Sequence, residues 1–212
     1  METTDKAIII LSSGPSGRVA SEIFEDNGQV TLGFLETKET DSMEVDDKPI
    51  LGQADDDGQL KLIGLKCDAF VGIDDGEQRK AYTSLLAKKR KVVPKNAFHA
   101  SAIISRYAQF GHGNLVQAGC IIQAGVEIDS GVFIHPHAVV EAGVKIGSYA
   151  TIHSSAVLGS EVTIGEGAII GAGAVIVSNT VVGAKAYVAP GSLVLATVEP
   201  KTKVHGNPAK PV

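Results

Sequence analysis

One spacing dominates this sequence, because an aliphatic or phenylalanine side chain stands at every sixth position from residue 98 to residue 194. Seventeen consecutive positions obey this rule, and no insertion interrupts them. A six-residue period of this length is typical of a hexapeptide β-helix, in which three hexads form one triangular coil of about 18 residues. The period therefore predicts that residues 18 apart lie above one another, separated by one strand spacing of about 4.8 Å.

Two further features of the repeat concern its interior and its corners. A small or β-branched side chain follows most of the large ones by four positions, and we expect it to point inward: Ala102, Ala108, Cys120, Val126, Val132, Ala138, Val144, Ala150 and Ala156. Tight corners can need backbone angles that only glycine adopts easily. The glycines expected to serve corners for this reason are Gly111, Gly147, Gly165, Gly171 and Gly183.

Residues 6–92 follow a different pattern, in which apolar strands alternate with helices. The expected strands are residues 6–11, 29–36 and 65–73, with an extended stretch at 48–52, and the expected helices are 18–27 and 76–91. This alternation predicts a small Rossmann-like α/β domain with a parallel sheet.

The change of period divides the chain into three segments. They are an α/β nucleotide-binding or sugar-binding domain at residues 1–96, a β-helix domain at 97–198 and a tail at 199–212. The tail contains Pro200, Pro208 and Pro211, which we expect to stop strand pairing.

The turn after the first strand, residues 12–17, reads Ser-Ser-Gly-Pro-Ser-Gly and keeps two of the three glycines of a dinucleotide-type loop. Backbone amides at the following helix start could hold a phosphate, although an ordinary strand-to-helix turn would look the same. Glu36 ends the second strand, where a carboxylate could accept from nucleotide hydroxyls or could simply be solvated. The substrate-binding candidates are Ser12, Gly14, Ser16, Gly17 and Glu36.

Composition and charge argue against several classes of protein. The chain has 212 residues, 44% of them hydrophobic, and a formal net charge of −5, which argues against a nucleic-acid or anionic-membrane partner. Cys67 and Cys120 form neither a disulfide framework nor a metal-ligand spacing. Without a signal peptide or a long apolar run, we expect a cytoplasmic protein outside the membrane.

Several segments together resemble the hexapeptide-repeat acyltransferases: KAIIILSSGPSGR, VTLGFLE, KPILG, NAFHASAIIS, the repeat itself and the tail sequence GNPAK. The resemblance is greatest to the group of sialic acid O-acetyltransferases and bacillosamine-pathway amino-sugar N-acetyltransferases. It implies a left-handed parallel β-helix, a homotrimer, acetyl-CoA bound between neighbouring prisms, and a sugar or nucleotide-sugar substrate reached from the N-terminal domain.

The same resemblance locates the catalytic base of the family at a coil corner. The family places a histidine at the position of Ala142, and a second histidine at the position of Thr151. Neither imidazole is present in this chain. The usual base for deprotonating the attacking amine or hydroxyl is therefore absent from its usual place.

Other histidines share a column, because His99, His135 and His153 differ by multiples of 18. His135 and His153 should stack, and His137 lies close by in the sequence. Three interpretations are open: a polar ladder without chemistry, a displaced general base, or a three-nitrogen metal site that lacks a carboxylate or cysteine. The catalytic candidates are His135, His137, His153 and the corner residue Glu141, which could orient an imidazole or amine; no metal is expected.

The resemblance also implies residues for acetyl-CoA, which the family binds through backbone groups of later coils and basic residues near the tail. The counterparts here are Ser160, Ser178, Lys203 and Lys210, with Lys185 as a further possibility. Any of these lysines could equally be ordinary surface charge.

The leading hypothesis is an acetyl-CoA-dependent acyltransferase that acetylates an amino or hydroxyl group of a sugar or nucleotide-sugar for surface glycan synthesis. The alternative is a non-catalytic binding or scaffold protein, which Ala142 and Thr151 favour. A serine acetyltransferase fits less well, because those enzymes usually have a helical N-terminal region.

Overall fold

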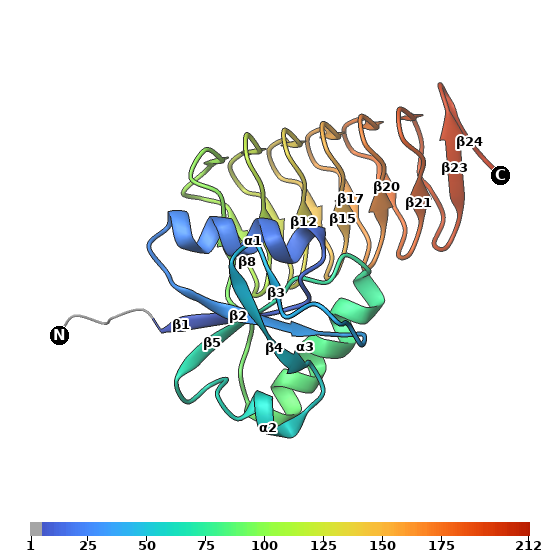
Figure 1. Ribbon diagram of the computed structural model, residues 1–212. Helices are drawn as coiled ribbons and strands as arrows, with labels where there is room; N and C mark the ends of the chain where they lie inside the picture. Colours follow the sequence, from blue (N-terminus) through green and yellow to red (C-terminus); the bar gives the residue numbers. More distant parts are fainter. Residues whose placement is uncertain (1–5) are drawn as a thin grey trace. The chain divides into compact units, whose positions relative to one another are not determined.

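The computed structural model describes residues 6–212, which divide into one compact unit ending at Ala97 and another spanning Phe98–Val212 (Figure 1). The first unit is a five-stranded sheet in the order β3-β4-β2-β1-β5. Its elements are β1 (Ala7–Leu11), α1 (Pro15–Asp26), β2 (Thr31–Glu36), β3 (Glu44–Val45), β4 (Lys48–Gln53), α2 (Asp57–Leu60), β5 (Cys67–Val71) and α3 (Gly76–Arg90). The strands run parallel except for β3, which forms an antiparallel hairpin with β4.

Local sequence explains these elements. Residues 8–11 of β1 are fully buried, as expected of a central parallel strand with both faces covered. Helix α1 begins with Pro15, whose missing amide hydrogen is not needed in a first turn. Helix α3 begins where the side chain of Asp75 accepts a hydrogen bond from the amide of Gln78. The predicted α/β domain is confirmed, with the short α2 and β3 as additions.

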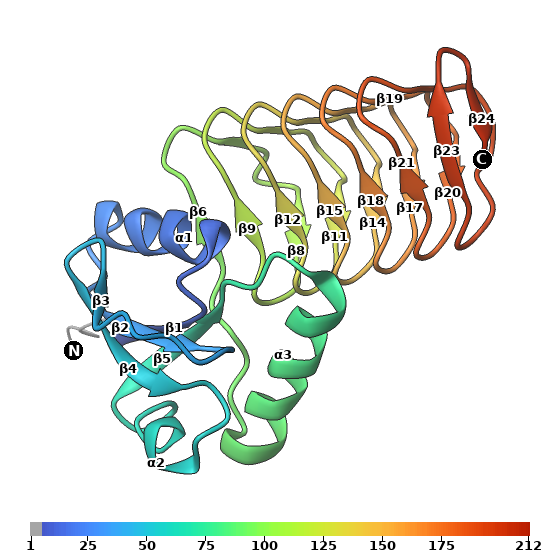
Figure 2. The same cartoon turned by 45° about the vertical axis from the view of Figure 1, so that its right-hand side comes forward.

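The second unit is a parallel β-helix with three sheets, seen from the side in Figure 2. The first sheet contains β6 (Ala97–Phe98), β9 (Leu115–Val116), β12 (Phe133–Ile134), β15 (Thr151–Ile152), β18 (Ile169–Ile170), β21 (Tyr187–Val188), β23 (Lys203–Gly206) and β24 (Ala209–Pro211). The second contains β7 (Ile103–Ile104), β10 (Ile121–Ile122), β13 (Val139–Val140), β16 (Val157–Leu158), β19 (Val175–Ile176) and β22 (Leu193–Val194). The third contains β8 (Gln109–Phe110), β11 (Glu127–Ile128), β14 (Lys145–Ile146), β17 (Thr163–Ile164) and β20 (Val181–Val182).

The six-residue rule is confirmed in both register and packing. Strand partners are 18 residues apart, as in the pair Ile134 and Ile152. Every sixth residue from Val116 to Val194 is buried in one continuous core, together with the small residues between them. The three-sheet β-helix is therefore held by a column of aliphatic side chains along its axis.

The expected reason for the corner glycines is wrong. Left-handed backbone angles occur at a different position of the hexad: Gly113, Gly119, Gly125, Gly131, Gly143, Gly167, Gly173 and Gly191. Non-glycine residues such as His137 and Asn179 adopt the same angles. Gly165 is needed for space instead, since a Cβ there would lie 2.4 Å from the amide nitrogen of Ala184 in the next coil.

The expectation that tail prolines stop strand pairing is also wrong. Strand β23 continues the first sheet in parallel with β21, and β24 folds back antiparallel on β23. Pro211 lies within β24, opposite Val204, because an edge strand tolerates a residue without an amide hydrogen. Within residues 6–212, no helix has the length and apolar character needed to cross a membrane.

Candidate active site

The β-helix has three rows of corners, which we name by the sheets that they join. In the coil that contains β12, β13 and β14, the first corner is residues 135–138, the second 141–144 and the third 147–150. Each corner repeats 18 residues later in the next coil. Residues six apart in the sequence therefore lie at neighbouring corners of one coil.

The first corner carries the predicted histidine stack. The rings of His135 and His153 are stacked, with centroids 5.0 Å apart and planes inclined by 15°. Nδ1 of His135 lies 3.2 Å from Nε2 of Gln117 in the preceding coil, which fixes the orientation of the ring. Below it in the same column, Nδ1 of His99 lies 3.0 Å from the amide nitrogen of Ser101.

His137 does not extend this stack. Its backbone adopts a left-handed conformation with φ of 62°, and its exposed side chain covers Gly119 in the preceding coil. In the part of the chain that the structure describes, no three His, Cys, Asp or Glu side chains form a group that could hold a metal ion. The histidines thus form a stacked pair with a separate third ring.

The thiol of Cys120 lies behind the histidine pair. Its Sγ is 3.1 Å from the carbonyl oxygen of His135. Burial raises the pKa of the Cys120 thiol, which disfavours the thiolate that a nucleophilic cysteine needs. This cysteine therefore acts as a small core residue.

The second corner carries the position where the resemblance places the family base. Ala142, Ser160 and Ser178 form one column there, at intervals of 18 residues. Oε2 of Glu141 accepts hydrogen bonds from both the amide and the hydroxyl of Ser160, each 2.8 Å long. Glu141 therefore links its own coil to the next one by hydrogen bonds. The His135–His153 pair lies one corner away from Ala142.

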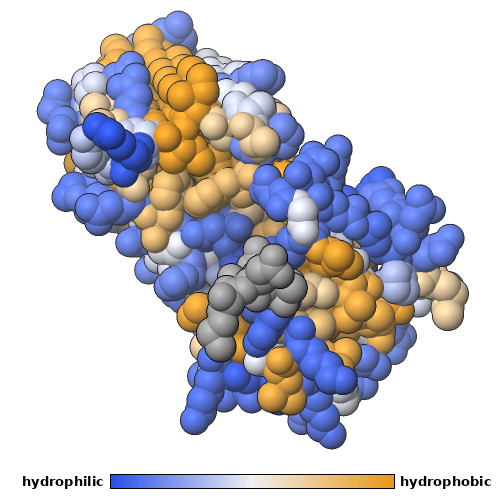
Figure 3. Space-filling view, turned by 90° about the vertical axis from the view of Figure 1, so that its left-hand side faces the viewer, coloured by the Kyte–Doolittle hydropathy of each residue, from blue (hydrophilic) through white to orange (hydrophobic). Residues whose placement is uncertain are grey.

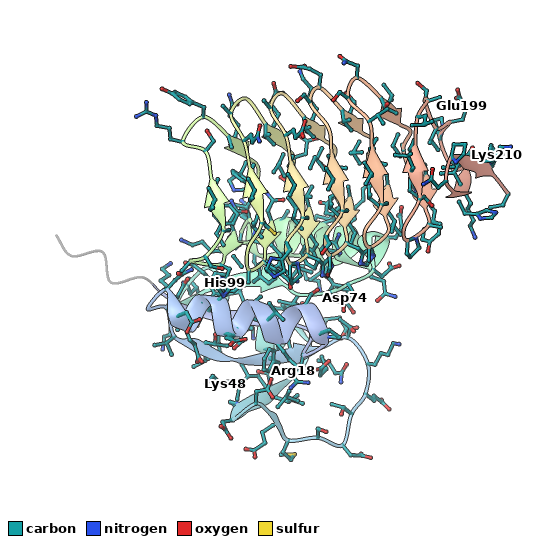
Figure 4. All side chains as sticks on the ribbon, turned by 90° about the horizontal axis from the view of Figure 1, so that it is seen from above. Arg18, Lys48, Asp74, His99, Glu199 and Lys210 are labelled. Carbon is teal, nitrogen blue, oxygen red and sulfur yellow. The ribbon has the colours of Figure 1, made fainter. Side chains whose placement is uncertain are left out.

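The remaining cofactor candidates lie elsewhere on the repeats. Lys203 and Lys210 belong to β23 and β24, which extend the first sheet, and Figure 4 labels Lys210 at the end of the coils. Lys185 is at a third corner and Thr151 is buried at the start of β15. Of the four cofactor candidates, the structure therefore groups Ser160 and Ser178 at the second corner, whereas Lys203 and Lys210 lie on the terminal hairpin.

An apolar cavity of about 370 Å³ lies where the last coil meets the tail. It is lined mainly by Val194, Leu195, Ala196, Val198, Val204 and Pro211. Ala196 continues the column of Ala142, Ser160 and Ser178, so the cavity lies at the end of the second corner.

In the first unit, the glycine loop is held by its own side chains. The amide of Gly14 donates to Oγ of Ser12 over 3.1 Å, and the amide of Ser13 donates to Oε1 of Glu36 over 3.0 Å. A Cβ at Gly17 would lie 1.9 Å from the carbonyl oxygen of Ser12, so only glycine fits there. The sequence candidates of this loop do come together, and Glu36 faces the loop.

Sequence reasoning missed two residues at this loop. The hydroxyl of Ser16 donates to the carboxylate of Asp74, which follows β5. The loop after β5 is in turn bound by the fully buried guanidinium of Arg79. The available signal was the position of Asp74, because the carboxyl ends of parallel strands converge at one edge of a sheet.

A charged cavity of about 560 Å³ lies between α1 and the β3–β4 hairpin. Arg18 binds Asp46 through two contacts of 2.5 and 2.8 Å, and Lys48 lies 2.8 Å from Glu25; Figure 4 labels both cations. The hydrogen bond from Arg18 lowers the pKa of Asp46. These pairs fasten the hairpin to the helix at a solvated surface, where each contributes little stability.

Comparison with known proteins agrees with this description. The family described as "Bacterial transferase hexapeptide (six repeats)" matches residues 126–160 and 161–196. No curated protein matches the sequence.

Solved structures match nearly the whole chain. A histidine-to-alanine variant of GDP-perosamine N-acetyltransferase from Caulobacter crescentus, solved with CoA and GDP-perosamine, is 27% identical with a TM-score of 0.88, covering 97% of this chain and 96% of its own. The acetyltransferase domain of PglB from Neisseria gonorrhoeae FA1090, solved with acetyl coenzyme A, shares the fold at 24% identity and a TM-score of 0.90, covering 98% of this chain and 100% of that domain.

The repeat and the α/β unit together define a class of two-part hexapeptide-repeat proteins. Within that class, the chain is similar in fold and repeat sequence to hexapeptide-repeat acetyltransferases.

Proposed function

We propose that this protein transfers an acetyl group from acetyl-CoA to an amino group of a nucleotide-linked sugar, as a step in surface glycan synthesis. The observation that carries the proposal is the 27% identity, over 97% of this chain, to an N-acetyltransferase that was solved with CoA and GDP-perosamine. That match spans both units, which supports an acceptor site and a donor site in this chain.

The second corner suits the pantetheine arm of acetyl-CoA. Ala142, Ser160 and Ser178 are small, and their column ends at the apolar cavity beside Ala196. Small side chains leave room for an extended chain along the coils. Lys203 and Lys210, on the terminal hairpin, are the proposed partners of the phosphates.

The missing histidine at Ala142 favours an amine acceptor over a hydroxyl. A neutral amine attacks the thioester carbonyl with its own lone pair, forming the C–N bond as the C–S bond breaks and CoA leaves as thiolate. Its proton passes to a base as the C–S bond breaks, whereas a hydroxyl must already be deprotonated during attack. We assign the proton acceptor to His135, whose ring is oriented by Gln117 and stacked on His153.

The surface of the second sheet supports self-association, and we propose the homotrimer implied by the resemblance. Its outward positions are all aliphatic: Ile103, Ile121, Val139, Val157, Val175 and Leu193. The third sheet instead presents Gln109 and the Lys145–Glu127 ion pair. Figure 3 shows hydrophobic side chains gathered on the repeats beside hydrophilic ones. A continuous apolar face of this kind is typical of a protein interface.

A second candidate function is a non-catalytic binding or scaffold protein. The observation in its favour is that no histidine of the described chain lies at the second corner, where Ala142 stands. Such a protein would keep the ligand sites and the assembly while releasing no CoA.

A thiol-release assay with acetyl-CoA and a panel of UDP-, GDP- and dTDP-linked amino sugars separates the two functions. The enzyme hypothesis predicts release that depends on one amino-sugar nucleotide and is lost in His135→Ala. Binding of acetyl-CoA or of a nucleotide sugar without release across the panel would support the scaffold and contradict the enzyme.

A further inference from the structure

The start of helix α1 already contains a carboxylate. The hydroxyl of Ser16 donates to Oδ1 of Asp74, and Oδ2 of Asp74 would lie 3.6 Å from a Cβ built on Gly14. In Figure 4 Asp74 lies at the end of α1 that carries Arg18. A helix start attracts anions, because its first amides lack intrahelical acceptors and its dipole is positive there. Asp74 thus stands where an incoming phosphate would bind.

Arg79 keeps Asp74 in this place. Its side chain is fully buried, and its Nη1 donates to the carbonyl oxygens of Ile73 and Asp74 over 2.7 and 2.9 Å. A buried guanidinium is costly unless it is hydrogen-bonded, so these carbonyls are strongly held. The backbone that carries Asp74 therefore has little freedom to turn the carboxylate away from α1.

A second carboxylate acts on the other side of the loop. Glu36 accepts the hydrogen bond of the Ser13 amide, while the Gly14 amide is bound to Ser12. Two of the amides that a phosphate loop offers are thereby engaged within the protein. A phosphate entering here would also meet the negative charges of Glu36 and Asp74, and like charges repel each other at this range.

We propose that Asp74, held by Arg79, is a specificity-determining residue that keeps phosphate out of loop 12–17. The loop then recognises hydrogen-bond donors of the acceptor, namely the hydroxyl or base N–H groups of its nucleoside, and the diphosphate lies outside the loop. Carboxylates that face a ligand accept from hydroxyl and N–H groups. The inference rests on the proposed function in one respect, the nucleotide linkage of the acceptor.

The test measures binding alone, by titration calorimetry on the full-length protein without acetyl-CoA. The probes are uridine, guanosine and thymidine, their 5′-diphosphates, and inorganic pyrophosphate. The test variant is Asp74→Asn, which removes one charge and keeps an oxygen for Ser16. The matched control is Asp75→Asn, which removes a charge from the next residue, where the side chain faces the amide of Gln78 instead. Asparagine is a good helix N-cap, so α3 should be kept.

For the preferred base, we expect the wild-type protein to bind the nucleoside within about threefold of its diphosphate. Asp74→Asn should strengthen diphosphate and pyrophosphate binding about tenfold, because a repelling charge is lost, and should not strengthen nucleoside binding. Asp75→Asn should leave all affinities within about twofold of wild type, since its carboxylate faces away from the loop.

Three results would overturn the inference: unchanged or weaker diphosphate binding in Asp74→Asn, an equal gain in Asp75→Asn, or no binding of any probe to the wild-type protein. A thermal melt of each variant checks that a loss of affinity is not a loss of fold. If the expected binding pattern appears but no acetyl transfer occurs, the proposed function fails and the role of Asp74 stands.

Discussion

The imidazole rings of His135 and His153 stack 5.0 Å apart in successive coils, one corner away from Ala142, the position where the resemblance places the family base. Gln117 holds the first ring from the coil before it. An ordered imidazole is a suitable proton acceptor, because the ordinary pKa of histidine lies near neutrality. We therefore expect His135 to act as the proton acceptor.

His135→Ala should lower kcat about 100-fold, the usual contribution of a general base, and should remove the acidic limb of the pH–rate profile. His153→Ala should lower kcat less, by about threefold, since that ring supports its neighbour without taking the proton. The matched control is His112→Ala, an exposed histidine at a third corner, which should leave kcat unchanged. Equal, small effects of all three substitutions would remove His135 from the mechanism.

Glu141 and Ser160 should contribute to stability as a coupled pair. Glu141→Ala should lower the free energy of unfolding by about 2 kcal/mol, because it leaves the amide and hydroxyl of Ser160 without their acceptor. Glu141→Gln keeps an acceptor oxygen and should cost about half as much. Urea denaturation of Glu141→Ala, Ser160→Ala and the double variant measures the coupling, and strictly additive losses would show that the pair does not act together.

Two classes of glycine should respond differently to a methyl group. Gly165→Ala should destabilise the repeats by about 3 kcal/mol, because its Cβ would overlap the backbone of the next coil. Gly173→Ala should cost about 1 kcal/mol, because the site is open and only the left-handed backbone is strained. Urea denaturation compares the two variants, and an equal loss of stability would refute the distinction.

The aliphatic face of the second sheet should determine oligomeric state. Ile121 is 36% exposed in one chain, and Ile121→Lys would place a charge in the proposed interface. Light scattering should show a trimer for the wild-type protein and a monomer for Ile121→Lys. Gln109→Lys, on the polar third sheet, serves as the control and should stay trimeric. A wild-type monomer would contradict the assembly.

The repeat was predictable because one side-chain property recurs at a fixed interval. Ile134 and Ile152 share a column by counting alone, and so do His135 and His153. The same period led to the wrong reason for the corner glycines. It shows where glycine recurs, but it does not show whether a left-handed backbone angle or a lack of space for a Cβ atom requires the glycine. At Gly165 and Gly183 there is no space for a Cβ atom, because successive coils approach closely there.

The candidate site was less accessible from sequence. Asp74 and Arg79 form no motif, and their connection to Ser16 depends on how β5 and β1 converge in the sheet. Glu141 and Ser160 are 19 residues apart, one more than a column, so their contact depends on side-chain direction. Such side-chain hydrogen bonds depend on tertiary geometry, which the periodicity of the sequence does not reveal.

The most direct measurement follows an isotope-labelled acetyl group from acetyl-CoA into an amino-sugar nucleotide by NMR. We expect a new amide carbon signal on the sugar, formed by the wild-type protein and strongly reduced in His135→Ala. Binding of both substrates without any labelled amide, or label found only as an ester, would contradict the N-acetyltransferase that we propose.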